Sequence, residues 1–173
     1  MSPTSEELQA ALERSGSETR AAFENRALMY AYLYEELAEE LGRERAVEVM
    51  KRAIYRRGLE VGRKYAAAAE AGNLAEVGRI FVDGSPCGGT FFEPAIEEIE
   101  DGRLVLRMCA CPLVDAWRAA GLSAEKIDTL CEIAAAVDEG TFEGAGLDLV
   151  FLDRLGKPGS SRCLLELVVP AEE

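Results

Sequence analysis

The sequence predicts an α+β fold, in which antiparallel N-terminal helices pack on an antiparallel sheet of two hairpins with intervening helices. Three observations predict this class. First, apolar residues recur at helical spacing up to about residue 71. Second, two later segments each contain two apolar runs separated by a turn, as in a β-hairpin. Third, helical patterns return between these two segments. With 173 residues the chain can bury one hydrophobic core. We therefore expect an N-terminal helical arm over residues 1–19 and a single α+β domain over residues 20–173.

Two helices are expected in the first half of the chain. The first has one apolar stripe in which spacings of four and three residues alternate: Phe23, Ala27, Tyr30, Tyr34, Leu37 and Leu41. Gly42 follows where a glycine ends a helix, and a second helix is expected over residues 44–65, antiparallel to the first. Gly58 and Gly62 lie one turn apart in it, and each costs about 1 kcal/mol relative to alanine. We interpret this pair as a place where another helix packs closely.

The second half of the chain contains the strands. A helix is expected over residues 73–82, and a glycine-rich loop over residues 83–90 then separates the halves. Asp101-Gly102 lies between apolar runs at 96–99 and 104–110, which predicts a hairpin. Helical patterns return at 112–120 and after Ser123. Strands expected at 147–153 and 162–169 form a second hairpin.

Composition limits the classes of function. The net charge of −13 repels phosphate backbones and anionic lipids, so we expect neither nucleic acid nor a membrane as partner. The sequence has no apolar run of 18 residues and no signal-like start, and we expect a cytoplasmic protein. It contains no histidine, which excludes Ser-His-Asp and Cys-His catalysis within one chain.

Cysteines are therefore the first candidates for chemistry. The five are Cys87, Cys109, Cys111, Cys131 and Cys163. An odd number in a reducing compartment indicates free thiols or metal ligands rather than disulfides. Their spacing matches no zinc motif, but a convergence of Cys111, Cys131 and Cys163 in the fold would favour zinc as the cofactor. Without such a convergence the sequence does not identify a cofactor.

Two of these thiols lie near the end of the second predicted strand. Alternation along that strand places Arg103, Val105, Arg107, Cys109 and Cys111 on one face. A neighbouring cation lowers the pKa of a thiol and makes it more reactive. Free cysteine also packs as a small buried hydrophobe, and for either residue alone we give the two interpretations equal weight.

The remaining candidates lie on the last helix and the last strand. Cys131 shares a helix face with Ala134, Ala135 and Asp138, and such a face can form the wall of a cavity because its side chains are small. The alternative, which the pattern slightly favours, is a tightly packed helix with Asp138 in solvent. Cys163 alternates with apolar residues and is more typical of a core position.

Short blocks of residues resemble a known family. They are Arg26-Ala27-Leu28-Met29-Tyr30, Glu44-Arg45-Ala46-Val47-Glu48, Tyr55-Arg56-Arg57-Gly58 with Gly62-Arg63, Cys111-Pro112 before Trp117, Gly121-Leu122-Ser123, Leu130-Cys131 and Cys163-Leu164-Leu165-Glu166-Leu167. Together they resemble the L-2-amino-thiazoline-4-carboxylic acid hydrolase family from about residue 20 to 169. The resemblance implies a hydrolase that opens a small cyclic amidine at a carbon–nitrogen bond.

The same resemblance leaves an alternative function open. The family is akin to vinyl-reductase-type domains, whose late glycine and cysteine elements resemble Gly140, Gly144 and Cys163. Those domains bind small molecules without necessarily converting them. A non-catalytic binding or sensor domain is therefore the alternative to a hydrolase, and a structural or assembly subunit is a third interpretation. In the first two cases the partner is a small molecule, and a homo-oligomer is compatible with the sequence.

The ring opening that the resemblance implies requires three chemical groups. It needs a nucleophile at the carbon between sulfur and nitrogen, a proton for the departing nitrogen and a cation for the substrate carboxylate. The candidates are Cys111 or Cys131 as the nucleophile, Asp138 or Asp115 as the proton donor, and Arg107 or Arg57 as the cation. The alternative nucleophile is a metal-bound hydroxide held by Cys111, Cys131 and Cys163.

Overall fold

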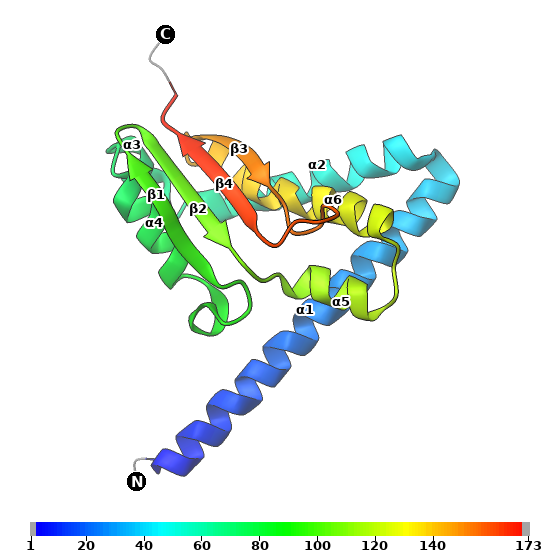
Figure 1. Cartoon of the computed structure of the whole chain (residues 1–173), viewed down its shortest axis with the longest axis horizontal. Coiled ribbons are helices and arrows are strands. Elements are labelled where there is room, and N and C mark those ends of the chain that lie inside the picture. The colour runs from blue at the N-terminus through cyan, green and yellow to red at the C-terminus, as the bar shows by residue number, and fades with distance from the viewer. Residues whose placement is uncertain (1–2, 171–173) are drawn as a thin grey trace.

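The computed structural model describes residues 3–170 and confirms the α+β class (Figure 1). The helices are α1 (Ser5–Leu41), α2 (Arg43–Gly62), α3 (Ala66–Glu70), α4 (Leu74–Asp83), the short 3-10 helix η1 (Pro86–Gly89), α5 (Pro112–Ala119) and α6 (Ala124–Glu143). The strands are β1 (Pro94–Glu100), β2 (Arg103–Met108), β3 (Asp148–Asp153) and β4 (Cys163–Val168). The ends of the predicted arm and domain, residues 1–2 and 171–173, lie outside the described residues.

The four strands form one antiparallel sheet in the order β1-β2-β4-β3. Both predicted hairpins are present, and Gly102 adopts the positive φ of +74° that the tight turn between β1 and β2 requires. The pairing of β2 with β4 joins the hairpins, with Arg103 opposite Val168 and Met108 opposite Cys163. Two segments some 60 residues apart in sequence thus form the centre of the sheet.

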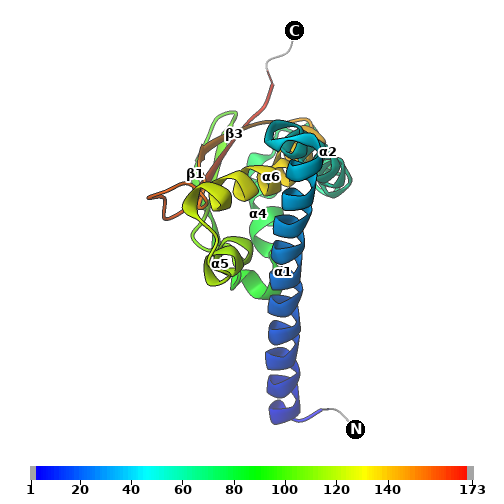
Figure 2. The ribbon, with the colours of Figure 1, turned by 90° about the vertical axis from the view of Figure 1, so that its right-hand side faces the viewer.

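Helices cover one face of this sheet. Helix α4 packs on β1 and β2, α6 contacts β3, and α2 lies mainly against α6 (Figures 1 and 2). Helix α1 packs on α5 and α2, and the indole N–H of Trp117 in α5 donates a hydrogen bond of 2.7 Å to the carbonyl of Ala27 in α1. The helices in direct contact with the strands are therefore α4 and α6, and the N-terminal pair forms a further layer behind them.

Helix α1 is longer than its packed part. A capping box at Thr4 begins it and Gly42, with φ +84°, ends it. Phe23, Ala27, Ala31 and Tyr34 are buried. The prediction that Leu41 belongs to the same buried stripe is wrong, because Leu41 is 48% exposed at the end of the helix. The first half of α1 projects from the molecule (Figure 1), and its side chains are largely exposed.

Glycines let α2 and α6 approach each other at the backbone. A Cβ on Gly58 would lie 2.3 Å from the carbonyl oxygen of Val137, and one on Gly140 would lie 2.2 Å from that of Tyr55. Gly62 likewise faces Thr141, whose carbonyl oxygen would lie 2.4 Å from a Cβ added to this glycine. The interpretation of close helix packing at Gly58 and Gly62 is confirmed, and its partner is α6.

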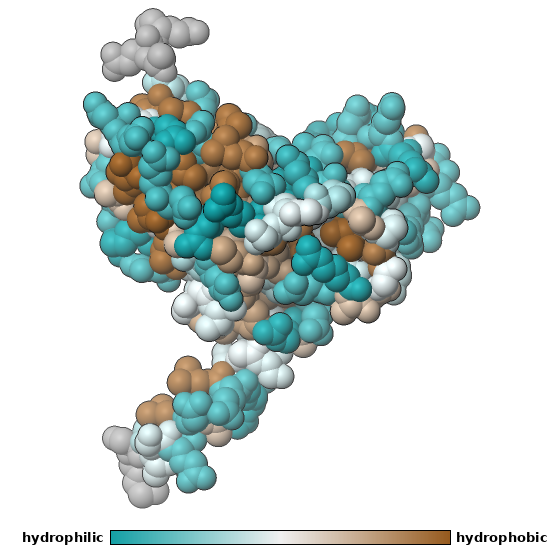
Figure 3. Space-filling view, viewed as in Figure 1, coloured by the Kyte–Doolittle hydropathy of each residue, from teal (hydrophilic) through white to brown (hydrophobic). Residues whose placement is uncertain are grey.

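The other face of the sheet is open. Figure 3 shows apolar side chains gathered over the sheet, where Val150 and Leu152 of β3 are about half exposed. Arg103 and Arg107 of β2 also lie on this face, since Leu104 and Leu106 between them are fully buried beneath the helices. Within residues 3–170, no helix is long and apolar enough to cross a membrane.

The α2–α6 contact gives the first prediction. Gly140→Ala should destabilise the protein by about 2–3 kcal/mol, because the added methyl group meets backbone atoms and not a flexible side chain. Gly16→Ala is the matched control. No atom outside its own helix lies within 4 Å of a Cβ there, and it should stabilise α1 by up to about 1 kcal/mol. Urea unfolding of the three proteins measures both effects, and an unchanged midpoint for Gly140→Ala contradicts the close contact.

Candidate active site

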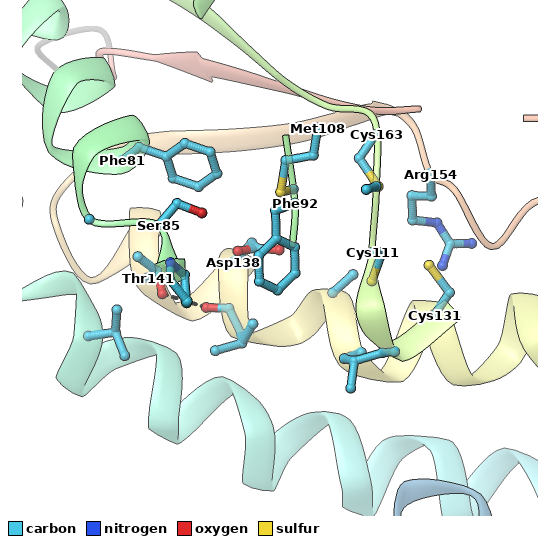
Figure 4. A pocket seen from close by; sticks show the side chains of 18 of the residues that line it. Phe81, Ser85, Phe92, Met108, Cys111, Cys131, Asp138, Thr141, Arg154 and Cys163 are labelled. Carbon is cyan, nitrogen blue, oxygen red and sulfur yellow. Dashed lines mark hydrogen bonds between the residues drawn. The ribbon is translucent and has the colours of Figure 1, made fainter. Parts of the chain in front are cut away.

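A cavity of about 430 Å³ lies between the helices and the inner face of the sheet (Figure 4). Its walls come from α1, α2 and the residues after it, α4 with the following loop, the end of β2 with the segment into α5, α6, β3 and β4. Its polar and sulfur-bearing lining residues are Arg26, Lys64, Tyr65, Ser85, Met108, Cys111, Cys131, Asp138, Thr141, Arg154 and Cys163. Most of the remaining wall is apolar, so few polar groups decide its chemistry.

Helix α6 supplies one wall. Cys131, Ala134, Ala135 and Asp138 all face the cavity, as a face of small side chains allows. The alternative of a tightly packed helix with Asp138 in solvent is wrong. The reason is that α6 packs on α2 through its glycine-bearing side, so its alanine face is left to line the space under the sheet.

Asp138 has an unusual environment for a carboxylate. Burial raises its pKa from the ordinary 3.8 to about 7, and the neighbouring charge of Glu139 acts in the same direction. Among the described residues, neither a hydrogen bond nor a cation offsets these effects. Near neutral pH the group therefore exchanges a proton readily, which is the property a general acid or base needs.

Three of the five thiols meet at the cavity. Cys111 precedes α5, Cys131 lies on α6 and Cys163 begins β4 (Figure 4). Burial raises the pKa of Cys111 to about 11 and of Cys163 to about 12, and it raises that of Cys131 as well. All three thiols are therefore protonated at neutral pH.

The other two thiols lie elsewhere. Strand β2 ends at Met108, so the alternation that placed Cys109 with Cys111 stops there and the two residues separate. The sulfur of Cys109 accepts a hydrogen bond of 2.6 Å from Arg107 outside the cavity. Cys87 is exposed on η1. The prediction that Cys109 and Cys111 share a strand face is wrong, because the strand ends before it reaches them.

The arginines chosen from the sequence do not line the cavity. Arg107 pairs with Glu97 at 2.6 Å on the open face of the sheet. Arg57 is exposed on α2 and pairs with Glu60 at 2.7 Å. Asp115 is also outside, 3.8 Å from Arg118 at the surface of α5. None of the three is within reach of a molecule bound between the helices and the sheet.

The cations that do line the cavity are Arg26, Lys64 and Arg154. Lys64 lies over the ring of Tyr65, and burial lowers its pKa. No sequence pattern pointed to Arg154, which follows β3 in the turn-rich segment between the last two strands. Arg26 belongs to a block that carries the family resemblance, although its role there could not be inferred from spacing alone.

The geometry does not support the zinc site. Within residues 3–170, no group of three or more Cys, Asp or Glu side chains is arranged to hold a metal ion. Cys111, Cys131 and Cys163 line the same cavity, and the backbone N–H of Leu155 donates a hydrogen bond of 3.2 Å to the sulfur of Cys163. We assign no step to a metal.

The fold thus encloses, between an antiparallel sheet and the helices that cover it, a cavity lined by three thiols and one carboxyl group. Residues 20–157 match the L-2-amino-thiazoline-4-carboxylic acid hydrolase family. Because this match covers most of the 173 residues, the chain belongs to that family. A search of curated proteins found no match.

The raised pKa of Asp138 gives the second prediction. The folded protein keeps a proton that the unfolded chain releases above about pH 4, so Asp138 costs stability increasingly as the pH rises, up to and through about 7. Asp138→Asn removes this cost. Its stability advantage over the wild type should grow by about 3 kcal/mol between pH 5 and pH 8. Urea unfolding at both pH values measures it.

The control for this measurement is Asp101→Asn, in the exposed turn between β1 and β2. It should show no such pH-dependent gain, because an exposed carboxylate is solvated in both states. An Asp138→Asn protein whose advantage is the same at pH 5 and pH 8 contradicts a raised pKa at Asp138.

Proposed function

We propose that this protein is a hydrolase that opens a small cyclic amidine bearing a carboxylate, of the 2-aminothiazoline-4-carboxylate kind, at a carbon–nitrogen bond. The observation that carries the proposal is Asp138, a carboxyl group with a pKa of about 7 facing a largely apolar cavity that three thiols share. Family membership indicates the kind of substrate. The cavity volume of about 430 Å³ suits a small molecule.

Asp138 is the group that moves the proton. The chain has no histidine, and a carboxyl group with pKa near 7 is populated in both protonation states at neutral pH. As a carboxylate it takes the proton of the attacking group. As an acid it returns that proton to the ring nitrogen that leaves. One residue can therefore serve both halves of the reaction.

The attacking group is a cavity thiol or a water molecule. Since burial keeps the thiols of Cys111, Cys131 and Cys163 protonated at rest, a thiol must lose its proton before or during attack on the amidine carbon. A covalent adduct then forms and water hydrolyses it. If water attacks directly, the thiols only shape the cavity.

The substrate carboxylate requires a cation, and the cavity provides Arg26, Lys64 and Arg154. These residues replace Arg57 and Arg107 in the proposal, since the latter are paired at the surface. The protein carries a net charge of −13, so three cations around one cavity are a local reversal of its overall charge. This reversal supports an anionic or zwitterionic ligand.

The alternative is a small-molecule-binding domain without turnover. The observation that favours it is the protonated state of all three cavity thiols, which makes them poor nucleophiles at rest. In that case Asp138 would bind a cationic group of the ligand instead of moving a proton.

Turnover by point variants gives the third prediction. Asp138→Asn should lower kcat for 2-aminothiazoline-4-carboxylate by about 100-fold or more, the usual contribution of a general acid or base. Cys111→Ser and Cys131→Ser test the thiols and should abolish turnover wherever the substituted thiol is the nucleophile. Cys87→Ser, at an exposed position outside the cavity, is the control and should keep the wild-type rate.

The outcomes separate the two functions. Product formation by the wild type that survives Asp138→Asn contradicts the proposed role of Asp138. Loss with Asp138→Asn and full rates with both serine variants exclude Cys111 and Cys131 and leave water or Cys163 as the nucleophile. If the compound raises the melting temperature and no product forms, the protein is a binding domain.

The dependence of the rate on pH gives the fourth prediction. Because the carboxylate form of Asp138 accepts the first proton, kcat/KM should rise with pH up to an apparent pKa near 7. Steady-state rates between pH 5 and pH 9 measure this profile. A rate that stays constant from pH 5.5 to pH 8 rules out Asp138 as the base.

A further inference from the structure

The guanidinium group of Arg154 is largely buried beside the cavity. Its side chain is only 13% exposed, and its Nη2 donates a hydrogen bond of 3.0 Å to Oδ1 of Asp128 on α6. Among the buried side-chain nitrogens and oxygens of residues 3–170, Nη1 of Arg154 alone has no hydrogen-bond partner. A buried donor without an acceptor costs free energy, so this nitrogen needs an explanation.

The sulfur of Cys131 is a candidate acceptor. Figure 4 shows the guanidinium group of Arg154 and the thiol of Cys131 directed toward each other at one end of the cavity. The segment that follows β3 is packed tightly on Cys131, since a Cβ on Gly156 would lie 2.2 Å from the Cβ of Cys131. The backbone N–H of Gly156 and the charge of Arg154 both act to lower the pKa of this thiol. Arg154 and Gly156 therefore both favour its ionised form.

A neutral thiol is a weak acceptor, whereas a thiolate is a strong one. Ionisation of Cys131 would give Nη1 of Arg154 the partner that it lacks. The hydrogen bond from Nη2 to Asp128 holds the guanidinium group, so that the donor is in place before the thiolate forms. This arrangement is a preorganised site for one negative charge.

We propose that Arg154 is a positioning residue that stabilises the thiolate of Cys131, and that Cys131 is thereby the nucleophile among the three cavity thiols. The role of this thiolate as a nucleophile rests on the proposed hydrolysis. The pairing of Arg154 with Cys131 itself does not depend on the substrate.

The other charged groups around Cys131 support the same choice. The positive charge of Arg154 and the Gly156 N–H act to lower the pKa of Cys131, against burial, which is the largest effect, and the negative charges of Asp128 and Asp138. Cys111 and Cys163 also receive backbone N–H groups, but no cation offsets their burial, and their pKa values are about 11 and 12. Of the three, Cys131 alone has a cationic neighbour.

The chemical step balances with water as the co-reactant. The Cys131 thiolate forms a bond to the amidine carbon, the ring carbon–nitrogen bond breaks, and the departing nitrogen takes a proton from Asp138. Water then adds to the same carbon and gives a proton to the Asp138 carboxylate. The bond to the Cys131 sulfur breaks with its electron pair returning to sulfur, and the thiolate beside Arg154 is restored.

The test is the pH dependence of alkylation, measured separately for each cysteine. The full-length protein is treated with iodoacetamide, which is small and uncharged, from pH 6 to pH 11, and mass spectrometry of its peptides gives a rate for every thiol. In the wild type, Cys131 should show a lower apparent pKa than Cys111 and Cys163, which share its cavity. This comparison needs no variant and is independent of how well a substituted protein folds.

Substitutions then test Arg154 itself. Arg154→Gln should raise the apparent pKa of Cys131 by about one unit or more, because an adjacent cation lowers a thiol pKa by that order. Arg154→Lys, which keeps the charge, should restore part of the shift. Arg45→Gln is the control: it removes an exposed arginine that pairs with Glu48 on α2 and should leave Cys131 unchanged. The alkylation rate of the exposed Cys87, measured in every sample, shows whether reagent concentration and pH are comparable between samples.

Two results would overturn the inference: a wild-type Cys131 that titrates at or above Cys111 and Cys163, or an apparent pKa of Cys131 that is the same in Arg154→Gln and wild type. Neither outcome affects the proposed hydrolysis, which water can also carry out. Conversely, the expected alkylation profile in a protein that forms no product supports the pairing of Arg154 with Cys131 and removes the hydrolase function.

Discussion

The backbone contact between α2 and α6 is the constraint on which the rest of the structure depends. Gly58 and Gly140 let the two helices meet without side chains between them. This close contact uses one side of α6 and leaves its alanine-rich side facing the sheet. It also carries the end of α2, with Val61 and the following Lys64, to the edge of the same space. A cavity exists because one helix pair is packed so tightly that neither helix fills the gap beneath the strands.

That cavity sets the chemistry through burial. A carboxylate or thiolate taken out of water is destabilised unless a partner compensates, so each acidic group on the wall has a raised pKa. For Asp138 the shift ends near neutral pH and creates an acid–base group in a chain without histidine. For Cys111 and Cys163 it ends far above neutral pH, so both thiols stay protonated at rest. The same physical effect thus brings the pKa of one group to neutrality and takes those of the others away from it.

Local signals in the sequence were sufficient for the fold. Asp101-Gly102, the N-cap Ser123 and Gly42 each act within a few residues, and all three mark boundaries that the structure has. The site was predictable only in part, because the spacing of Cys131 and Asp138 shows a common helix face but not what that face meets. Alternation failed for Cys109 and Cys111, since it assumes a strand that continues beyond Met108. Arg154 had no sequence signal, as its position depends on a loop folding back onto α6.

That loop shows why three neighbouring thiols need not be equivalent. Arg154, Leu155 and Gly156 are consecutive, yet Leu155 donates its N–H to Cys163 at 3.2 Å while the residues on either side face Cys131. One short segment therefore gives Cys163 a single neutral donor and Cys131 a neutral donor together with a cation. Burial raises the pKa of both thiols, but Arg154 acts to lower that of Cys131, whereas Cys163 has no such cation and is raised further by its neighbouring thiols. In the proposed reaction, the charge of Arg154, which Asp128 holds and whose Nη1 otherwise lacks an acceptor, is the feature that sets Cys131 apart from the other two thiols.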